Sequence, residues 1–217
     1  MAAGIAIAAV AGTGMASQTP AEPVAASTTA TPAPSESASP PPSSSSPSPS
    51  SSSSPSSSSP SPSKPGPSSG PAVSAPTWLT VESAGMDMKI LPLTPTAEDE
   101  ASQSLVPPLT DDAYWLTTFG KPGDGSTDTT YITGHSWEGR EAPFNRLSGD
   151  AKIGDTITLT TETGKLEYVI DSVTTHDKNT LKDSDIWDVV PNRLVVISCY
   201  TEDLWGKNVV VTAMPKW

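Results

Sequence analysis

A run built from only two residue types divides this chain into a part that can bury a core and a part that cannot. Every residue from Ser39 to Ser63 is Ser or Pro, and the bias extends from about Thr19 to Pro76. Such a segment has little apolar surface to bury, so burial cannot offset the entropy lost on ordering. We therefore expect residues 19–76 to be a disordered, extended spacer.

The folded unit is expected in the C-terminal part of the chain, residues 77–217. All six Trp, all four Tyr and both Phe lie between Trp78 and Trp217. This part is about 140 residues long, enough for one ordinary domain core. The formal net charge of the chain is −12 and nearly all of it falls here, which argues against a nucleic-acid partner.

The first residues, 1–18, are small and apolar. They suit the apolar region of a secretion signal or a short membrane anchor, although no basic residues precede them and a comfortable bilayer span needs ~20 residues. We expect that this segment continues upstream or is cleaved; a disordered Ala-rich tail is the alternative. A spacer that could reach on the order of 150 Å beyond such a segment suits an extracytoplasmic domain that faces a cell wall.

The only cysteine, Cys199, ends a short apolar run rich in β-branched residues, which is typical of a buried strand. One cysteine excludes an internal disulfide, and a cysteine at a strand end is often a simple packing residue. Two other strand-like runs change that interpretation: one ends on His135 and the other begins with Lys207. A thiol, an imidazole and a cation at one end of a sheet are the groups that thiol-based acyl transfer needs.

The order of these runs resembles the sortases, most closely the class F sortases, which are cysteine transpeptidases of Gram-positive bacteria. The match includes a Pro-Gly segment before the histidine strand, then an Ala-Pro-Phe-x-x-Leu segment and a Gly-Asp pair: residues 122–126, 142–147 and 154–155. The second glycine of the first segment falls one residue early. The resemblance covers residues 77–217 and implies a closed eight-stranded β-barrel. Many short strand-like runs with close turn signals independently favour a mostly antiparallel sheet closed into a barrel.

The resemblance also implies roles for individual residues. Cys199 is the expected nucleophile, whose thiolate attacks a peptide carbonyl, and His135 pairs with it and donates a proton to the leaving amine. Sortases carry an arginine near the start of the last strand, but this chain has none beyond Arg193. We expect Lys207, within about one residue of that position, to supply the cation, although lysine lacks the planar fork of guanidinium.

Three further residues are expected near the substrate. Arg140 follows the histidine strand and is a second candidate cation. Ser198 occupies the position where sortases usually have threonine, and we expect it to support the thiol. Tyr200 follows the cysteine and is expected to line the same cleft.

No metal ion or cofactor is expected. Some sortases bind calcium, but the acidic run at residues 98–100 shows no repeated ligand spacing, so residues 94–108 are expected to be a solvated polar loop. The second histidine of the domain, His176, is assigned to the surface. Other strands and helical turns are expected at residues 78–81, 86–90, 142–147, 156–161, 166–173 and 183–187.

The leading hypothesis is an exported cysteine transpeptidase anchored at the membrane or secreted. It would cleave a C-terminal sorting motif of the Leu-Pro-x-Thr-Gly type and join the new carboxyl end to an amine of a cell-wall precursor; the resemblance alone supplies these substrates. Two alternatives stay open. The missing arginine would suit a non-catalytic wall or pilus-binding module on the same fold, and water in place of the amine would make the protein a thiol hydrolase.

Overall fold

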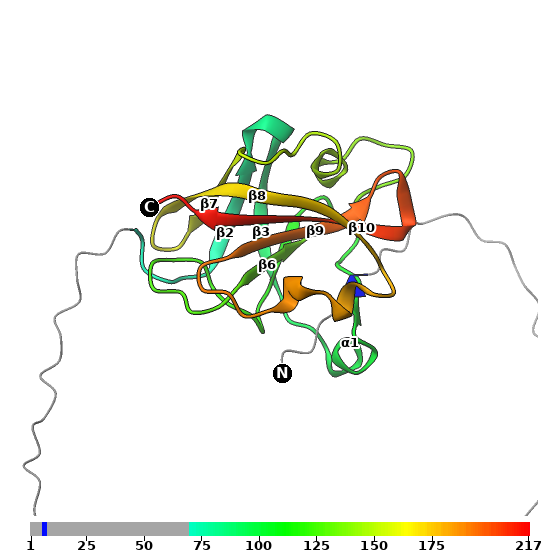
Figure 1. Ribbon diagram of the computed structural model, residues 1–217, viewed down its shortest axis with the longest axis horizontal. Coiled ribbons are helices and arrows are strands. Elements are labelled where there is room, and N and C mark those ends of the chain that lie inside the picture. Colours follow the sequence, from blue (N-terminus) through cyan, green and yellow to red (C-terminus); the bar gives the residue numbers. More distant parts are fainter. Residues whose placement is uncertain (1–5, 8–69) are drawn as a thin grey trace, which may run out of the picture. The chain divides into compact units, whose positions relative to one another are not determined.

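The structure is a computed structural model that describes residues 6–7 and 70–217, and these residues contain a closed β-barrel (Figure 1). The expected apolar segment 1–18, except for residues 6–7, and the spacer up to residue 69 lie outside the described residues. In chain order the elements are β1 (Ala6–Ile7), β2 (Pro76–Val81), η1 (Glu82–Ala84), β3 (Met86–Leu93), α1 (Ala97–Ser102), β4 (Ser104–Leu105), β5 (Ala113–Leu116), β6 (Thr130–Thr133), η2 (Pro143–Leu147), β7 (Thr156–Thr161), β8 (Lys165–Asp177), η3 (Leu181–Asp183), η4 (Asp185–Trp187), β9 (Leu194–Tyr200) and β10 (Asp203–Pro215).

The barrel closes in the order β10-β8-β7-β2-β3-β5-β6-β9. Its neighbours are antiparallel except for the pairs β3–β5 and β6–β9, which are parallel. The short strands β1 and β4 form a separate parallel pair. The closed eight-stranded barrel and its mostly antiparallel pairing are therefore confirmed.

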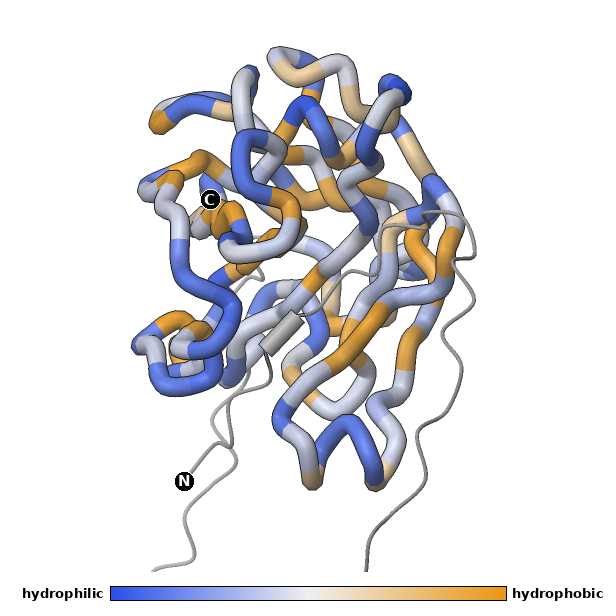
Figure 2. The backbone as a smooth tube through the Cα atoms, turned by 90° about the vertical axis from the view of Figure 1, so that its right-hand side faces the viewer, coloured by the Kyte–Doolittle hydropathy of each residue, from blue (hydrophilic) through white to orange (hydrophobic). Residues whose placement is uncertain are grey.

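Strand β9 is apolar from Leu194 to Ile197 because both of its faces are covered. Leu194 and Val196 belong to the cluster that fills the barrel, to which every barrel strand contributes. Val195 and Ile197 point the other way, into a second cluster outside the barrel that includes Trp187 of η4. Figure 2 shows the resulting apolar stretches along the strands, interrupted by hydrophilic turns. Side chains on a strand alternate between its faces, so Cys199 shares the outer face of Val195 and Ile197.

One expectation about secondary structure was wrong. Residues 97–102 of the expected polar loop form the helix α1. Thr96 caps it, because its side chain accepts from the Asp99 N–H while the Asp99 carboxylate accepts from the Thr96 N–H. This reciprocal capping and the acidic residues in the first turn stabilise a short helix that has no buried face. The helical turns expected at 142–147 and 183–187 are present as η2 and η3–η4.

Residues 70–75, which composition placed in the spacer, are hydrogen-bonded to the barrel. The Ser74 N–H donates to the Pro122 carbonyl at 3.1 Å, and the Thr163 hydroxyl donates to the Ala72 carbonyl at 2.6 Å. These residues therefore belong to the packed unit. Within the part of the chain that the structure describes, the helices are too short and too polar to cross a membrane.

Candidate active site

The parallel pair β6–β9 brings the predicted histidine and cysteine to the same level. Thr133, the last residue of β6, lies opposite Ile197 in the ladder. Each chain then continues two residues in the same direction, to His135 and Cys199. Both residues are almost fully buried, with 3% and 1% of their surface exposed. The expected meeting of these two strand ends is thus present in the fold.

A lysine that the sequence did not single out contacts the thiol. Lys178 follows the last residue of β8, and its N–H donates to the Gly206 carbonyl, so the pairing with β10 continues by one residue. Its ammonium lies 3.3 Å from Cys199 Sγ and donates to the Leu204 carbonyl at 2.6 Å. A cation is therefore held against the sulfur from the end of a neighbouring long strand.

His135 is held by a backbone carbonyl from the loop before β5. Its Nε2 lies 2.6 Å from Pro107 O, and because a carbonyl oxygen only accepts, Nε2 carries the proton and Nδ1 is the basic nitrogen of the neutral ring. Burial lowers the pKa of His135 below its ordinary value of 6.5; the Pro107 bond acts in the opposite direction, and the charge of Lys178 lowers the pKa further. The imidazole is therefore neutral at neutral pH.

Ser198 lies behind the thiol rather than beside it. It is completely buried, and its hydroxyl donates to the Gly134 carbonyl at 2.7 Å. Ser136 lies 2.9 Å from the same hydroxyl and donates to the Cys199 carbonyl at 2.8 Å. The two serines tie the histidine segment to the cysteine strand, and so they fix the relative positions of the two reactive side chains.

Arg140 is paired with a carboxylate and stacked on an indole. Its guanidinium donates through both terminal nitrogens to Asp111 and lies 4.2 Å from the centre of the Trp137 ring. The bidentate bonds from Arg140 hold the pKa of Asp111 below its usual value. Arg140 thus clamps the loop that supplies Pro107 to the segment that carries His135 (residues 135–140).

Lys207, the predicted cation, faces away from the thiol. Asn208 lies opposite both Cys199 in β9 and His176 in β8, and residues paired directly across a ladder share a face. Lys207 precedes Asn208 and lies opposite Asp177, so alternation turns it to the other face. Lys178 comes two residues after His176 and is therefore on the face of Cys199.

A hollow of about 340 Å³ adjoins the end of the cysteine strand. It is lined by residues 137–139, Asn145 and residues 201–205, which include two Trp and three acidic residues. Tyr200, expected to line the cleft of Cys199, packs instead against the cluster that fills the barrel. Its hydroxyl donates to Glu202 at 2.7 Å, a bond that raises the pKa of the tyrosine. The segment that follows the cysteine strand therefore lines this hollow with carboxylates and the Trp205 ring.

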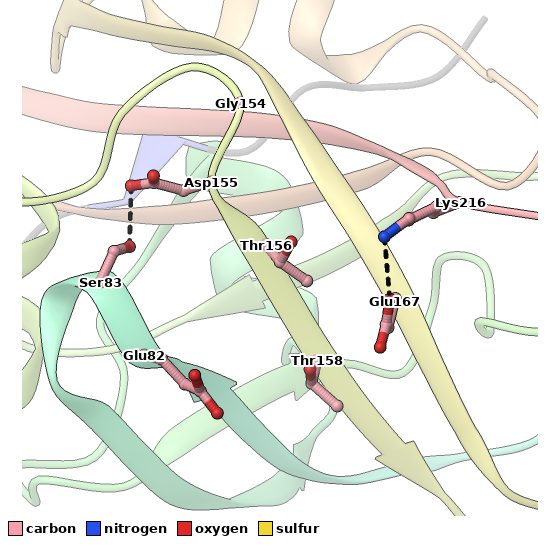
Figure 3. A pocket seen from close by; sticks show the side chains of 8 residues that line it. All are labelled: Glu82, Ser83, Gly154, Asp155, Thr156, Thr158, Glu167 and Lys216. Atoms are coloured by element: carbon pink, nitrogen blue, oxygen red, sulfur yellow. Dashed lines mark hydrogen bonds and ion pairs between the residues drawn. The ribbon is translucent and has the colours of Figure 1, made fainter.

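A second hollow, of about 530 Å³, is polar and lies on another wall of the barrel (Figure 3). Its residues come mainly from η1, β7 and β8, and in the barrel order β7 and β2 stand across from β9. Figure 3 shows two of its carboxylates already engaged, Asp155 with Ser83 at 2.7 Å and Glu167 with Lys216 at 3.5 Å. This hollow is lined by no cysteine or histidine and is not part of the site around Cys199.

The arrangement can carry out acyl transfer by a thiol. The Cys199 thiol is a candidate nucleophile, His135 is a neutral imidazole within the same buried region, and Lys178 is a positive charge in contact with the sulfur. Sequence reasoning missed Lys178, Ser136 and the Pro107 carbonyl. No sequence signal pointed to Lys178, because the strand expected at residues 166–173 ends five residues before it.

The comparisons with known proteins agree with this fold. No protein-family model matches the sequence, and no curated protein matches it. Sortase C1 of Streptococcus agalactiae, in its complex with MTSET, has a TM-score of 0.50 at 14% identity over 65% of this chain and 68% of that chain. Two further solved structures have TM-scores of 0.49 at 19% identity. They are a lid mutant of sortase A from Corynebacterium diphtheriae, over 68% and 72% of the two chains, and sortase A of Listeria monocytogenes, over 67% and 88%. Sortases of classes A, C and D are among the structural neighbours. By its likeness to sortase C1, the described part of this chain has the sortase-like β-barrel fold.

Proposed function

We propose that this protein is a cysteine transpeptidase of the class F sortase type. The observation that carries the proposal is the meeting of three groups at one end of the barrel: the Cys199 thiol, the neutral His135 imidazole and the Lys178 ammonium. These are a nucleophile, a base and a counter-charge for the anions formed during acyl transfer. Beyond the site itself, the ordered motifs that resemble class F sortases support the finer assignment.

The reaction runs through a thioester. The proton of Cys199 passes to His135 as the sulfur forms a bond with the peptide carbonyl carbon, and the carbonyl electron pair moves to oxygen. The tetrahedral intermediate then collapses, the C–N bond breaks, and the imidazolium of His135 returns the proton to the leaving amine. A second amine attacks the thioester, forms the new amide and releases the thiol.

The substrates follow from the resemblance. The acyl donor is a sorting peptide of the Leu-Pro-x-Thr-Gly type on an exported protein, and the acceptor is an amine of a cell-wall precursor. The hollow at residues 137–139 and 201–205 supports an amine acceptor, because its carboxylates attract a cation toward the end of the cysteine strand. The domain acts outside the cytoplasm, joined to the membrane through its N-terminal segment or secreted, and it needs no cofactor or nucleic acid.

A trapped thioester tests the proposal. The full chain is incubated with a model sorting peptide, and the mass of the protein is measured with and without an added amine such as triglycine. We expect an adduct at Cys199 that the amine converts into a peptide product. Cys199→Ala should give neither species while its free energy of unfolding stays within about 2 kcal/mol of the parent, since alanine leaves only a small cavity.

The alternatives give different results in the same experiment. A hydrolase would form the adduct but release only the shortened acid, whatever amine is added. A non-catalytic wall or pilus-binding module would bind peptide without any adduct. Adduct formation by Cys199→Ala would refute the nucleophile assignment.

A further inference from the structure

We propose that Lys178 is a catalytic residue whose ammonium stabilises the sulfur anion of Cys199. This inference rests on the proposed function for its chemistry, but the contact with the sulfur can be tested without any peptide substrate. It assigns the cationic role to the end of β8, rather than to the start of β10 where the sequence placed it.

The hydrogen bonds of Lys178 hold its charged ammonium group against the sulfur of Cys199. The backbone is held by the bond from its N–H to the Gly206 carbonyl, and the ammonium is held by the Leu204 carbonyl at 2.6 Å. The ammonium also points to Cys199 Sγ at 3.3 Å. The lysine is half-buried and the thiol is buried, so water screens this pair less than it screens a surface pair.

Other charged groups around the thiol are engaged or face elsewhere. From the β6 side His135 faces the thiol and is neutral, because burial lowers its pKa. In the β9–β10 turn Glu202 accepts from the Tyr200 hydroxyl and Asp203 accepts from the Gly206 N–H.

From β8, His176 precedes Lys178 by two residues and lies 3.0 Å from the Thr174 hydroxyl. Across the site, the ion pair of Arg140 and Asp111 neutralises both partners. Lys207 lies on the opposite face of β10. Among these charged side chains, Lys178 is therefore the positive one whose ammonium contacts the sulfur.

The chemistry needs a cation at this point because the imidazole starts neutral. When the proton leaves Cys199 for His135, the sulfur becomes an anion, and the Lys178 ammonium in contact with it lowers the energy of that anion. The charge of Lys178 also disfavours protonation of His135. Because the ammonium contacts the sulfur directly, it stabilises the thiolate more than it destabilises the imidazolium.

The rate of thiol alkylation as a function of pH tests this pairing directly. The full chain is treated with iodoacetamide between about pH 5 and pH 10, and carbamidomethylation of its single cysteine is followed by mass. The variants are Lys178→Met, which keeps most of the length of the side chain without its charge, and Lys178→Arg, which keeps the charge. Lys216→Met is the matched control, because it removes a lysine paired with Glu167 in the hollow of Figure 3.

We expect Lys178→Met to move the alkylation midpoint to higher pH and to lower the rate at neutral pH about tenfold, which corresponds to one pKa unit in thiolate fraction. Lys178→Arg and the control should keep midpoints close to that of the parent. An unchanged midpoint in Lys178→Met would overturn the proposal. A raised midpoint in Lys207→Met, with Lys178→Met unaffected, would assign the cation to β10.

Two further measurements distinguish a catalytic Lys178 from a purely structural one. Circular dichroism melting of each variant shows whether the bond to the Leu204 carbonyl only supports the fold. A lower melting temperature with an unchanged alkylation midpoint would mean that Lys178 only stabilises the turn between β9 and β10.

The peptide assay with Lys178→Met should show kcat/KM reduced about a hundredfold, comparable to the loss of one oxyanion donor, with partial recovery in Lys178→Arg. If the parent forms no thioester while the alkylation shift is present, the proposed function fails and the thiol–lysine pairing stands.

Discussion

At the scale of single residues, His135 shows how burial sets the protonation state of a site. The residue is 3% exposed, and its ring is bonded to Pro107 O through its protonated nitrogen. Removing the imidazole from water disfavours the charged form, and the nearby Lys178 adds to that effect. His135, the proposed base, is therefore neutral at neutral pH and can accept a proton.

The lowered pKa of His135 makes the stability of the fold depend on pH. The unfolded chain takes up this proton near pH 6.5, before the folded chain does, so the free energy of unfolding should fall as the pH drops below about 6.5 and should level off below the folded pKa. His135→Gln keeps an N–H donor for Pro107 and removes the titration. Urea unfolding at about pH 7.5 and about pH 5 should show a smaller loss in this variant than in the parent. Equal losses would mean that His135 carries its charge in the folded state.

At the scale of elements, the position of the histidine segment depends on η2. Phe144, in the Ala-Pro-Phe-x-x-Leu motif, is fully buried and packs against the backbone just before His135. A Cβ built on Gly134 would lie 2.0 Å from the Phe144 ring. Gly134 and Phe144 are therefore complementary: the phenylalanine ring fills the space that a side chain at Gly134 would occupy.

Gly134→Ala should displace Phe144 and with it the histidine. We expect it to lower the free energy of unfolding by about 1–3 kcal/mol, as overpacking does, and to slow thioester formation by more than the loss of folded protein explains. Gly149→Ala, where no heavy atom lies within 4 Å of the added Cβ, is the control and should stay near the parent. Denaturant unfolding and single-turnover mass measurements check both variants. A stable and fully active Gly134→Ala would show that η2 does not position the site.

The elements also show why some of the site was predictable. Cys199 follows an apolar run and His135 follows a run rich in Thr, Tyr and Ile, so their place at strand ends could be read from the sequence. Lys178 could not, because the apolar alternation of β8 fades after Val173 while pairing with β10 carries the strand on to Asp177. The carbonyl that holds His135 leaves no signature in side-chain chemistry. By contrast, the cap of α1 is visible in the sequence as Thr96-x-x-Asp99, and the polar character of the surrounding loop obscured it.

At the scale of the whole molecule, the barrel is extended by chain that composition assigned to the spacer. Residues 70–75 run against the barrel, where Ala72 pairs in parallel with Asp124 of the Pro-Gly motif. Gly123 makes this close approach possible, because a Cβ there would lie 2.4 Å from the Val73 Cα and its φ is +143°. The Pro-Gly motif thus packs residues 70–75 against the loop that leads into β6.

Gly123→Ala should release residues 70–75 from the barrel. In the full chain we expect a lower melting temperature and faster amide exchange at Ser74, whose N–H bonds to the Pro122 carbonyl, since the added methyl meets backbone rather than a flexible side chain. The Cys199 alkylation profile should stay unchanged. Hydrogen exchange with mass detection checks this, and unchanged protection at Ser74 would show that the contact with Gly123 does not hold the segment.

The parallel pairing of β6 with β9 has a consequence for the order of assembly. Parallel neighbours need a long crossover, and here the chain from Gly134 to Arg193 intervenes, carrying η2, β7 and β8 with it. Contacts this far apart in sequence form late in folding, because the entropy of closing the loop is lost before they can stabilise anything. Thiol, imidazole and ammonium therefore come together only when the final strands dock. In an incompletely folded chain the thiol is not yet beside the imidazole and the ammonium, so the proposed acyl transfer would begin only with the finished fold.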